Sequence, residues 1–341
     1  MSACYSIHGL AQLVVEGDSA QAQLAAHFLD GFRTHASDGG MRWYPDGRPP
    51  DDAVAVAADG AAHVVAGPDG WTFFGQQNVY AMLQCQLVRS GASLVHGCAL
   101  EVDGEGVLVW GRGGVGKSTV ALSVYDDERV HLLSDDKVVA LEDGTVASFP
   151  APLSIYPYHD PLFPPDVRRS LSRRRRRGLA ARVVKSIPAG VRAGGYVRRR
   201  LLALGGTVSS IAAEVNADYL AIAQRDLFPP DRLCATAELT HAIELVRGGT
   251  RWEIHPLEAD ECRRGMIATT YLELEMAQAL AGYALAGLVD LADHYRRADE
   301  AIDAFLAGTR LTRLSVPDGA RPADLQRTVL ELARGRQTVP A

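Results

Sequence analysis

The sequence has 341 residues, of which 47% are hydrophobic and 22% charged, as expected for a soluble globular protein of one large domain or two ordinary ones. No run of about eighteen apolar residues occurs, which excludes a membrane-spanning helix. The net charge of −6 argues against general nucleic-acid affinity, and five cysteines without C-x-x-C spacing argue against structural zinc or a disulfide framework. Without a secretory leader pattern, we expect a cytoplasmic protein.

Residues 1–90 predict a small N-terminal α+β domain. Residues 5–15 have the composition of a strand, and residues 20–32 show helical apolar spacing after an Asp-Ser pair that could cap a helix. Asp-Gly and Gly-Pro-Asp-Gly turns then separate short apolar runs, which is typical of a strand meander. The sequence therefore predicts strands over 54–58, 62–66 and 71–75, followed by a helix over 78–89.

The segment Gly111–Ser118 reads GRGGVGKS and follows the apolar run 106–110. A strand that leads into a G-x-x-x-x-G-K-[ST] loop and then a helix, here predicted over 119–125, is the context required for a phosphate-binding loop. We expect Lys117 to contact the β- and γ-phosphates of a nucleotide and the Ser118 hydroxyl to bind Mg²⁺. The predicted cofactor-binding residues are Gly111, Arg112, Gly113, Gly114, Val115, Gly116, Lys117, Ser118 and Thr119.

Two adjacent acids, Asp135 and Asp136, follow the predicted strand 130–133. Many phosphate-loop enzymes need an acid at a strand end to hold Mg²⁺, and a second carboxylate could accept the proton of an attacking hydroxyl. Repulsion between the two would raise one pKa. The alternative is an exposed Asp-Asp turn without function.

His96-Gly97 lies on the predicted strand 93–102, just before the loop strand. A single histidine on an apolar strand is usually a core residue, so His96 becomes a site candidate only as part of a larger pattern. Beyond the acids, a hairpin over 138–141 and 146–149 predicts a mixed sheet and not a purely parallel one.

Residues 150–165 contain six prolines and the run Tyr156-Pro157-Tyr158-His159, which predicts a structured loop or a lid. From residue 167 to 213 there are many arginines and no acid, including the run Arg173–Arg177. This basic insertion, 166–200, is either a clamp for an acidic or phosphorylated partner or a solvated loop. Nucleic acid is an improbable partner because few aromatic residues interleave the arginines.

The remaining pattern predicts strands over 211–215 and 241–246, helices over 257–305 and one further helix over 323–334. We expect three regions: the N-terminal domain, a phosphate-loop kinase core over 91–310, and a C-terminal tail or helix over 311–341.

Together, His96-Gly97, the loop Gly111–Ser118 and Asp135-Asp136 resemble the HPr kinase/phosphorylase family and its relatives in biosynthetic gene clusters. The similarity covers residues 94–136. It implies an α/β, phosphoenolpyruvate-carboxykinase-like core with a mixed sheet and, by family habit, a homo-oligomer. It also implies that Asp135 is the base, that His96 and Lys117 complete the catalytic set, and that Ser118 and Asp136 hold the metal.

The family's second signature, a glycine-bearing motif with an arginine for phosphorolysis, has no counterpart here, which argues against the reverse reaction and against HPr as acceptor. The sequence thus predicts an ATP- and Mg²⁺-dependent kinase that phosphorylates a hydroxyl, foremost a Ser or Thr of a peptide or small protein. Two alternatives stay open: a small-molecule kinase for a sugar, nucleoside or amino acid, and a non-catalytic nucleotide sensor.

Overall fold

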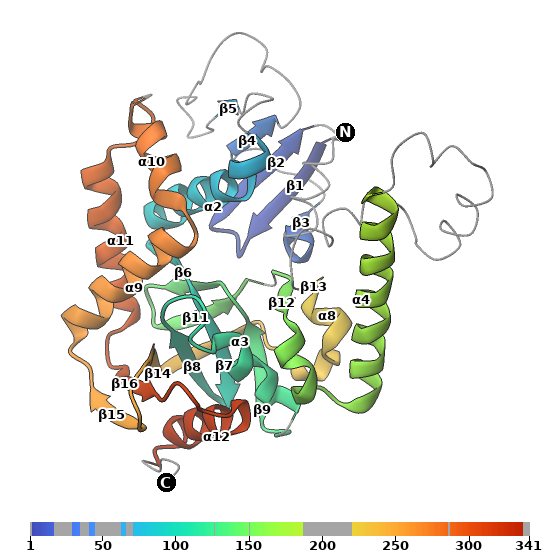
Figure 1. Ribbon diagram of the computed structural model, residues 1–341. Helices are drawn as coiled ribbons and strands as arrows, with labels where there is room; N and C mark the ends of the chain where they lie inside the picture. Colours follow the sequence, from blue (N-terminus) through green and yellow to red (C-terminus); the bar gives the residue numbers. More distant parts are fainter. Residues whose placement is uncertain are drawn as a thin grey trace, which may run out of the picture. The chain divides into compact units, whose positions relative to one another are not determined.

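A computed structural model describes residues 2–16, 29–34, 41–44, 63–65, 71–125, 127–149, 151–186, 220–285 and 287–336. The chain divides into two compact units: residues 1–151 together with 230–341, and residues 152–229. Both units contain helices and strands (Figure 1). The expected α/β class is confirmed, whereas the predicted regional boundaries at residues 90 and 310 stay a prediction.

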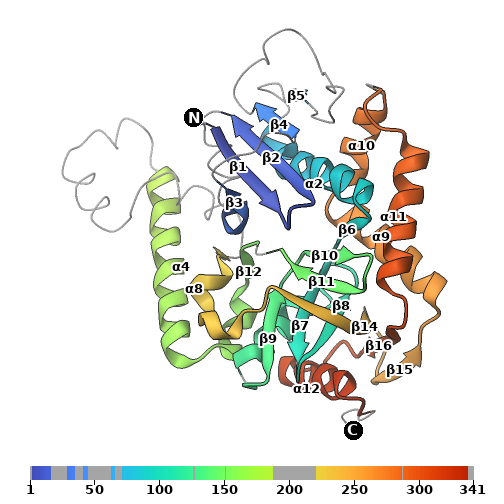
Figure 2. The same ribbon diagram turned by 180° about the vertical axis from the view of Figure 1, so that it is seen from behind.

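The larger unit is built around a nine-stranded mixed sheet, whose main path runs β6-β10-β11-β14-β8-β7-β9. The central strand β14 runs parallel to β8 and β16, while β8 pairs antiparallel with β7 (Figure 2). The strands are β6 (Ala92–Val95), β7 (Gly97–Val102), β8 (Glu105–Trp110), β9 (Val130–Ser134), β10 (Val138–Leu141), β11 (Thr145–Ser148), β14 (Thr236–Arg247), β15 (Glu253–Pro256) and β16 (Arg310–Val316). The expected mixed sheet is thereby confirmed.

A second sheet in the same unit has the order β3-β1-β2-β4-β5. Its strands are β1 (Ser2–Ile7), β2 (Ala11–Glu16), β3 (Arg33–Thr34), β4 (Met41–Tyr44) and β5 (His63–Val65), with a short 3₁₀ turn, η1 (Asp30–Phe32), before β3. Tyr5, Ile7 and Leu13 are fully buried and belong to the same apolar cluster as the helix α2 (Trp71–Arg89).

Helices from the C-terminal part of the chain complete this core. They are α9 (Ala259–Glu273), α10 (Met276–Leu285), α11 (Leu291–Phe305) and α12 (Pro322–Ala333), and α10 and α11 pack beside α2 (Figure 1). Met276, Leu280 and Ala298 lie in the apolar cluster that contains the N-terminal hairpin. The two ends of the sequence therefore share one hydrophobic core.

The smaller unit contains the pair β12 (Leu153–Ile155) and β13 (Leu220–Ile222), the helices α4 (Pro165–Ser186) and α8 (Gln224–Leu227), and the 3₁₀ turn η3 (Pro157–Leu162). The 3₁₀ turn η4 (Pro230–Arg232) belongs to the larger unit. Across the described ranges, no helix has both the length and the apolar character needed to cross a bilayer.

Several local expectations were wrong. Residues 71–75, predicted as a strand, form the first turns of α2, because the cooperative extension of a helix whose next residues are buried outweighs the β propensity of aromatic residues. Residues 5–15 form a hairpin and not one strand. The helices expected over residues 257–305 are present as α9, α10 and α11, whereas β15 and β16 were missed, β16 within the region expected to be a tail or helix.

Other expectations hold in outline. The hairpin β10–β11 and the helix α12 lie where the sequence placed them, and the helix after the loop is α3 (Lys117–Ala121) followed by the 3₁₀ turn η2 (Leu122–Tyr125). The basic insertion is helical through residue 186. The predicted strands 54–58 and 211–215, most of the predicted helix 20–32 and the rest of the basic insertion lie outside the described residues.

Candidate functional site

The phosphate-loop sequence connects the buried strand β8 to the helix α3, as the motif requires. Gly111, with φ 139°, begins the turn directly after Trp110, and a Cβ on it would lie 2.5 Å from the backbone oxygen of Leu245 on the neighbouring strand β14. Gly116 precedes α3 with φ 114°. Only glycine satisfies both the conformation and the close approach at Gly111, so the loop is packed directly against the sheet.

Lys117 lies under the loop, 7% exposed, and its ammonium donates to the carbonyl oxygens of Gly111 at 2.7 Å and Arg112 at 2.9 Å. Burial lowers the pKa of Lys117, while the carboxylates of Asp136 and Asp135 act in the opposite direction. The ammonium is therefore held at the loop by two carbonyls that a phosphate oxygen could replace as partners.

Asp135 is 1% exposed and follows the last residue of β9. Burial, and then the charge of Asp136, raise the pKa of Asp135 to about 6, while the Ser118 hydroxyl and the Lys117 charge lower it in part. Neither oxygen of its carboxylate has a hydrogen-bond partner of good geometry. A buried carboxyl with unsatisfied oxygens beside a phosphate-loop lysine is suited to accept a proton or a metal ion.

Asp136 has a more open position and a different set of partners. Its side chain is 42% exposed, its backbone has φ 73°, and its Oδ1 lies 3.4 Å from Nδ1 of His96. Its Oδ2 pairs with the ammonium of Lys137. Burial would raise the pKa of Asp136, but Lys137 and His96 outweigh it and lower the pKa to about 2. Asp136 is therefore ionised at neutral pH, and its left-handed backbone aims it away from the direction that an extended strand would give.

His96 lies where the chain changes partners, between β6, which pairs with β10, and β7, which pairs with β8 and β9. It is 6% exposed, and its backbone N–H donates to the Thr270 hydroxyl at 3.0 Å. Burial, followed by the charge of Lys117, lowers the pKa of His96 to about 4. The ring is therefore neutral at pH 7, and it reaches the site from the junction between β6 and β7.

The structure thus brings Lys117, Ser118, Asp135, Asp136 and His96 together at one edge of the sheet. Two further members of this group had no predicted role. Lys137, 3% exposed, lies over the ring of Tyr80 at 4.7 Å from its centroid, and Asp136 holds its pKa above the usual range although burial lowers it. Its position in the sequence, directly after Asp135 and Asp136, could have indicated that it belongs to the site.

The second missed residue is Glu273, at the C-terminal end of α9. A Cβ on Gly113 would lie 3.0 Å from its Oε2, and its charge acts on both His96 and Lys117. Glu273 is remote in sequence from the loop, and no motif marks it. It places a third carboxylate at the edge of the phosphate loop.

The donor set fits a magnesium ion that is bound partly through a nucleotide. Mg²⁺ prefers oxygen ligands and usually takes one or two carboxylates plus phosphates and water. Ser118, Asp135 and Asp136 offer such oxygens, and neither carboxylate oxygen of Asp135 has a hydrogen bond of good geometry. Within the described ranges, no group of three or more His, Cys, Asp or Glu residues is arranged to hold a metal without further ligands.

The smaller unit shows what part of the basic insertion does locally. Arg175 pairs with Asp160 and donates to the Ile155 carbonyl at 3.1 Å, and Arg168 donates to the carbonyls of Pro161 and Phe163. Tyr156 and Tyr158 stack at 5.4 Å. These arginines of α4 therefore fix the proline-rich segment, which forms an ordered turn.

Comparison of the sequence with models of known protein families gives no match, and neither does comparison with the sequences of curated proteins. Among solved structures, the chain is similar to the Hpr(Ser) kinase/phosphatase from Coxiella burnetii, at 12% identity, over 71% of this chain and 95% of that one, with a TM-score of 0.28. That structure belongs to the family that the motifs resemble. Because the TM-score is low, no residue role is taken from it.

Proposed function

We propose that the chain binds a nucleoside triphosphate with Mg²⁺ in the Gly111–Ser118 loop and transfers the γ-phosphoryl group to a hydroxyl. The observation that carries the proposal is the convergence of Lys117, Ser118 and the acids Asp135 and Asp136 at the end of β8. In this view the core is a phosphoenolpyruvate-carboxykinase-like phosphate-loop fold, and ATP is the donor.

The chain's own residues supply binding and proton transfer. The loop N–H groups and Lys117 bind the β- and γ-phosphates, and Ser118 and Asp136 hold the magnesium, which neutralises charge on the transferred group when bound. The acceptor oxygen forms a bond to the γ-phosphorus as the bond from that phosphorus to the β–γ bridging oxygen breaks. The acceptor proton passes to Asp135, and a nucleoside diphosphate leaves.

The pKa values of the two acids favour this division of roles. Asp135, whose pKa is raised to about 6, is a better base near neutral pH than Asp136, whose pKa is lowered to about 2. Asp136 is ionised throughout this range, as a metal ligand must be. The closeness of the Ser118 hydroxyl to Asp135 favours the reverse division, in which Asp135 serves the metal.

Matched Asp135→Asn and Asp136→Asn variants separate these roles. We expect Asp135→Asn to lower phosphoryl transfer by about 10²–10⁴-fold with nucleotide affinity retained, because loss of a general base removes about that much rate. Asp136→Asn should instead raise the Mg²⁺ concentration needed for half-maximal nucleotide binding. The measurements are calorimetry with an ATP analogue and transfer from labelled ATP. A reversed pattern would exchange the two roles.

For the acceptor, we propose a Ser or Thr hydroxyl of a peptide or small protein, on the strength of the basic insertion in the sequence. Labelled ATP is incubated with the protein and either candidate peptides or a set of hydroxylated metabolites. A labelled peptide supports this acceptor, and labelled metabolite identifies a small-molecule kinase. Tight nucleotide binding without transfer to any acceptor would make the chain a nucleotide sensor.

A further inference from the structure

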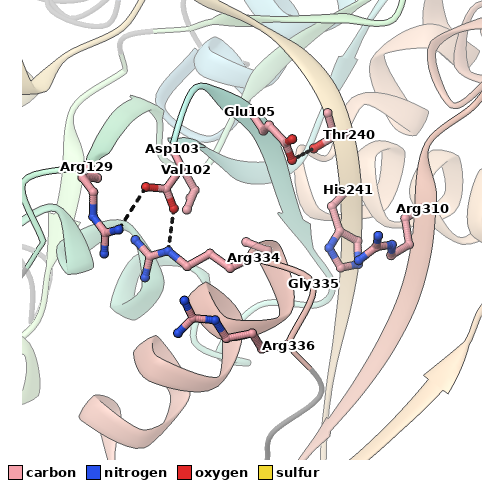
Figure 3. Close-up of a pocket in the computed structure, with 11 residues that line it drawn as sticks. Val102, Asp103, Glu105, Arg129, Thr240, His241, Arg310, Arg334, Gly335 and Arg336 are labelled. Atoms are coloured by element: carbon pink, nitrogen blue, oxygen red, sulfur yellow. Dashed lines mark hydrogen bonds and ion pairs between the residues drawn. The ribbon is translucent and has the colours of Figure 1, made fainter.

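A cavity of about 420 Å³ lies at the opposite end of β8 from the phosphate loop. It is lined by the turn between β7 and β8, by the first residues of β8 and β16, by the middle of β14 and by the C-terminal end of α12 (Figure 3). Since β8 covers six residues at about 3.3 Å each, the cavity and the loop are separated by roughly the length of that strand. It is therefore distinct from the proposed nucleotide site.

The cavity has a surplus of positive charge. Four arginines and two acids line it: Arg129, Arg310, Arg334, Arg336, Asp103 and Glu105. Asp103 pairs with both Arg129 and Arg334, at 3.4 and 2.6 Å (Figure 3). Asp127 pairs with the same two arginines. These four residues neutralise one another, so Asp103, Arg129 and Arg334 line the cavity without offering it a free charge.

Arg310 and Arg336 are different, because neither guanidinium has an ion pair with any described acid. Glu105, the remaining acid, accepts a hydrogen bond from the Thr240 hydroxyl at 3.2 Å. Burial, followed by the charge of Arg310, lowers the pKa of His241 to about 4, so its ring adds no charge at pH 7. Two cations that form no ion pair with a described acid therefore face one cavity together with a single carboxylate, that of Glu105, so a net positive charge remains there in a chain whose net charge is −6.

The backbone fixes both arginines. Arg310 is the first residue of β16 and is registered beside His241 of β14. At the end of α12, the N–H of Arg336 donates to the carbonyl of Glu331 at 2.8 Å and that of Gly335 to Leu332 at 2.9 Å. These two bonds form a Schellman motif, which holds the residue after the helix in a defined position. The negative end of the α12 dipole opposes an anion here, but its half charge is smaller than two full cations.

We propose that this cavity is a second binding site, and that it takes a small dianion, either a phosphate compound or a dicarboxylate, between Arg310 and Arg336. Guanidinium groups bind both kinds of oxyanion through paired hydrogen bonds, which is why the shared chemistry is a compact doubly charged oxyanion. The cavity volume is sufficient for a small molecule.

The test is calorimetric titration of the full chain with inorganic pyrophosphate and, separately, with succinate. The variants are Arg310→Gln/Arg336→Gln, the charge-matched control Arg251→Gln/Arg264→Gln on exposed arginines elsewhere, and Lys117→Met for the loop. We expect the first variant to weaken binding of at least one anion about tenfold or more. The control should bind as the wild type does, and a fraction of the binding should survive Lys117→Met.

Binding of succinate identifies the dicarboxylate source, and binding of pyrophosphate alone identifies the phosphate source. Equal affinity in the wild type and Arg310→Gln/Arg336→Gln would overturn the proposal. An equal loss in the charge-matched control would also overturn it, since general charge attraction would then account for the heat. Anion binding in this test does not depend on phosphoryl transfer. A negative result therefore leaves the proposed kinase activity unaffected, and a lack of kinase activity leaves this second binding site unaffected.

Discussion

The two ends of β8 handle charge in opposite ways. At its C-terminal end, Lys117, Asp135 and Lys137 are less than a tenth exposed, and the acids Asp135 and Asp136 compensate the two lysines. At its N-terminal end, Arg310 and Arg336 are exposed and lack an acidic partner among the described residues. Buried charges are costly unless paired, so the charges of the first arrangement depend on one another, whereas the second leaves two cations for the small anion that we propose.

Glycine substitutions at the two ends of β8 should destabilise the protein to different extents, because one turn is packed against β14 and the other is open. Gly111→Ala combines a positive φ with a Cβ that would lie 2.5 Å from the Leu245 carbonyl, and Gly104→Ala, in the turn between β7 and β8, has φ 90° with no atom within 4 Å. We expect a loss of about 3–5 kcal/mol for the first and about 1–2 kcal/mol for the second in urea unfolding. Equal losses would show that the loop relaxes away from β14.

The pH dependence of stability should distinguish the two acids. Because the folded-state pKa of Asp135 is raised to about 6, the folded protein binds the proton more tightly, and stability falls as pH rises from about 4 to 6. Asp135→Asn removes this loss, by about 3 kcal/mol at most for a shift of about two units. The measurement is urea unfolding between pH 2 and 7 with a chelator present.

The contribution of Asp136 to stability should depend on pH in the opposite direction, and the same urea unfolding experiment measures it. Its folded-state pKa is lowered to about 2, so its stabilising contribution is complete above its usual value near 4 and is lost as pH falls toward 2. Asp136→Asn should therefore flatten the acid limb of the curve and reduce, without removing, the fall between pH 4 and 6, because the burial of Asp135 remains when the charge of Asp136 is lost. Identical curves for the two variants would contradict the assigned environments.

At the other end of the strand, paired and unpaired arginines should differ in stability. The side chain of Arg334 is 13% exposed and bonds Asp103 at 2.6 Å and Asp127 at 2.7 Å. We expect Arg334→Gln to cost about 1–3 kcal/mol in thermal unfolding, because two carboxylates lose a partly buried partner. Arg310→Gln should stay within about 0.5 kcal/mol of the wild type. A large loss there would reveal a structural role.

The smallest expected effect concerns Glu273 beside the loop. Its carboxylate, close to Gly113, repels a triphosphate unless a metal lies between them. We expect Glu273→Gln to tighten nucleotide binding about threefold without Mg²⁺ and to have a smaller effect with it, as measured by calorimetry in low salt. Weaker binding in the variant when Mg²⁺ is present would instead make Glu273 part of the metal site.

The sequence by itself determined the phosphate-loop site to a large extent, because its signals are local. The glycines, Lys117 and Ser118 lie within one turn between a strand and a helix, and Asp135-Asp136 end the strand β9, so their residue types and order nearly fix the arrangement. The hairpin β10–β11 and the helix α12 were predictable for the same reason.

Only the tertiary structure decided features that join distant segments. It placed Glu273 at the loop and joined the N-terminal hairpin to α10 and α11 in one core. It also inserted β16 beside β14 and thereby set Arg310 against the end of α12. Such contacts depend on which faces of the elements pack together and not on the spacing of residues along the chain, so no sequence motif indicates them. The pairing of charges between these segments follows from that packing.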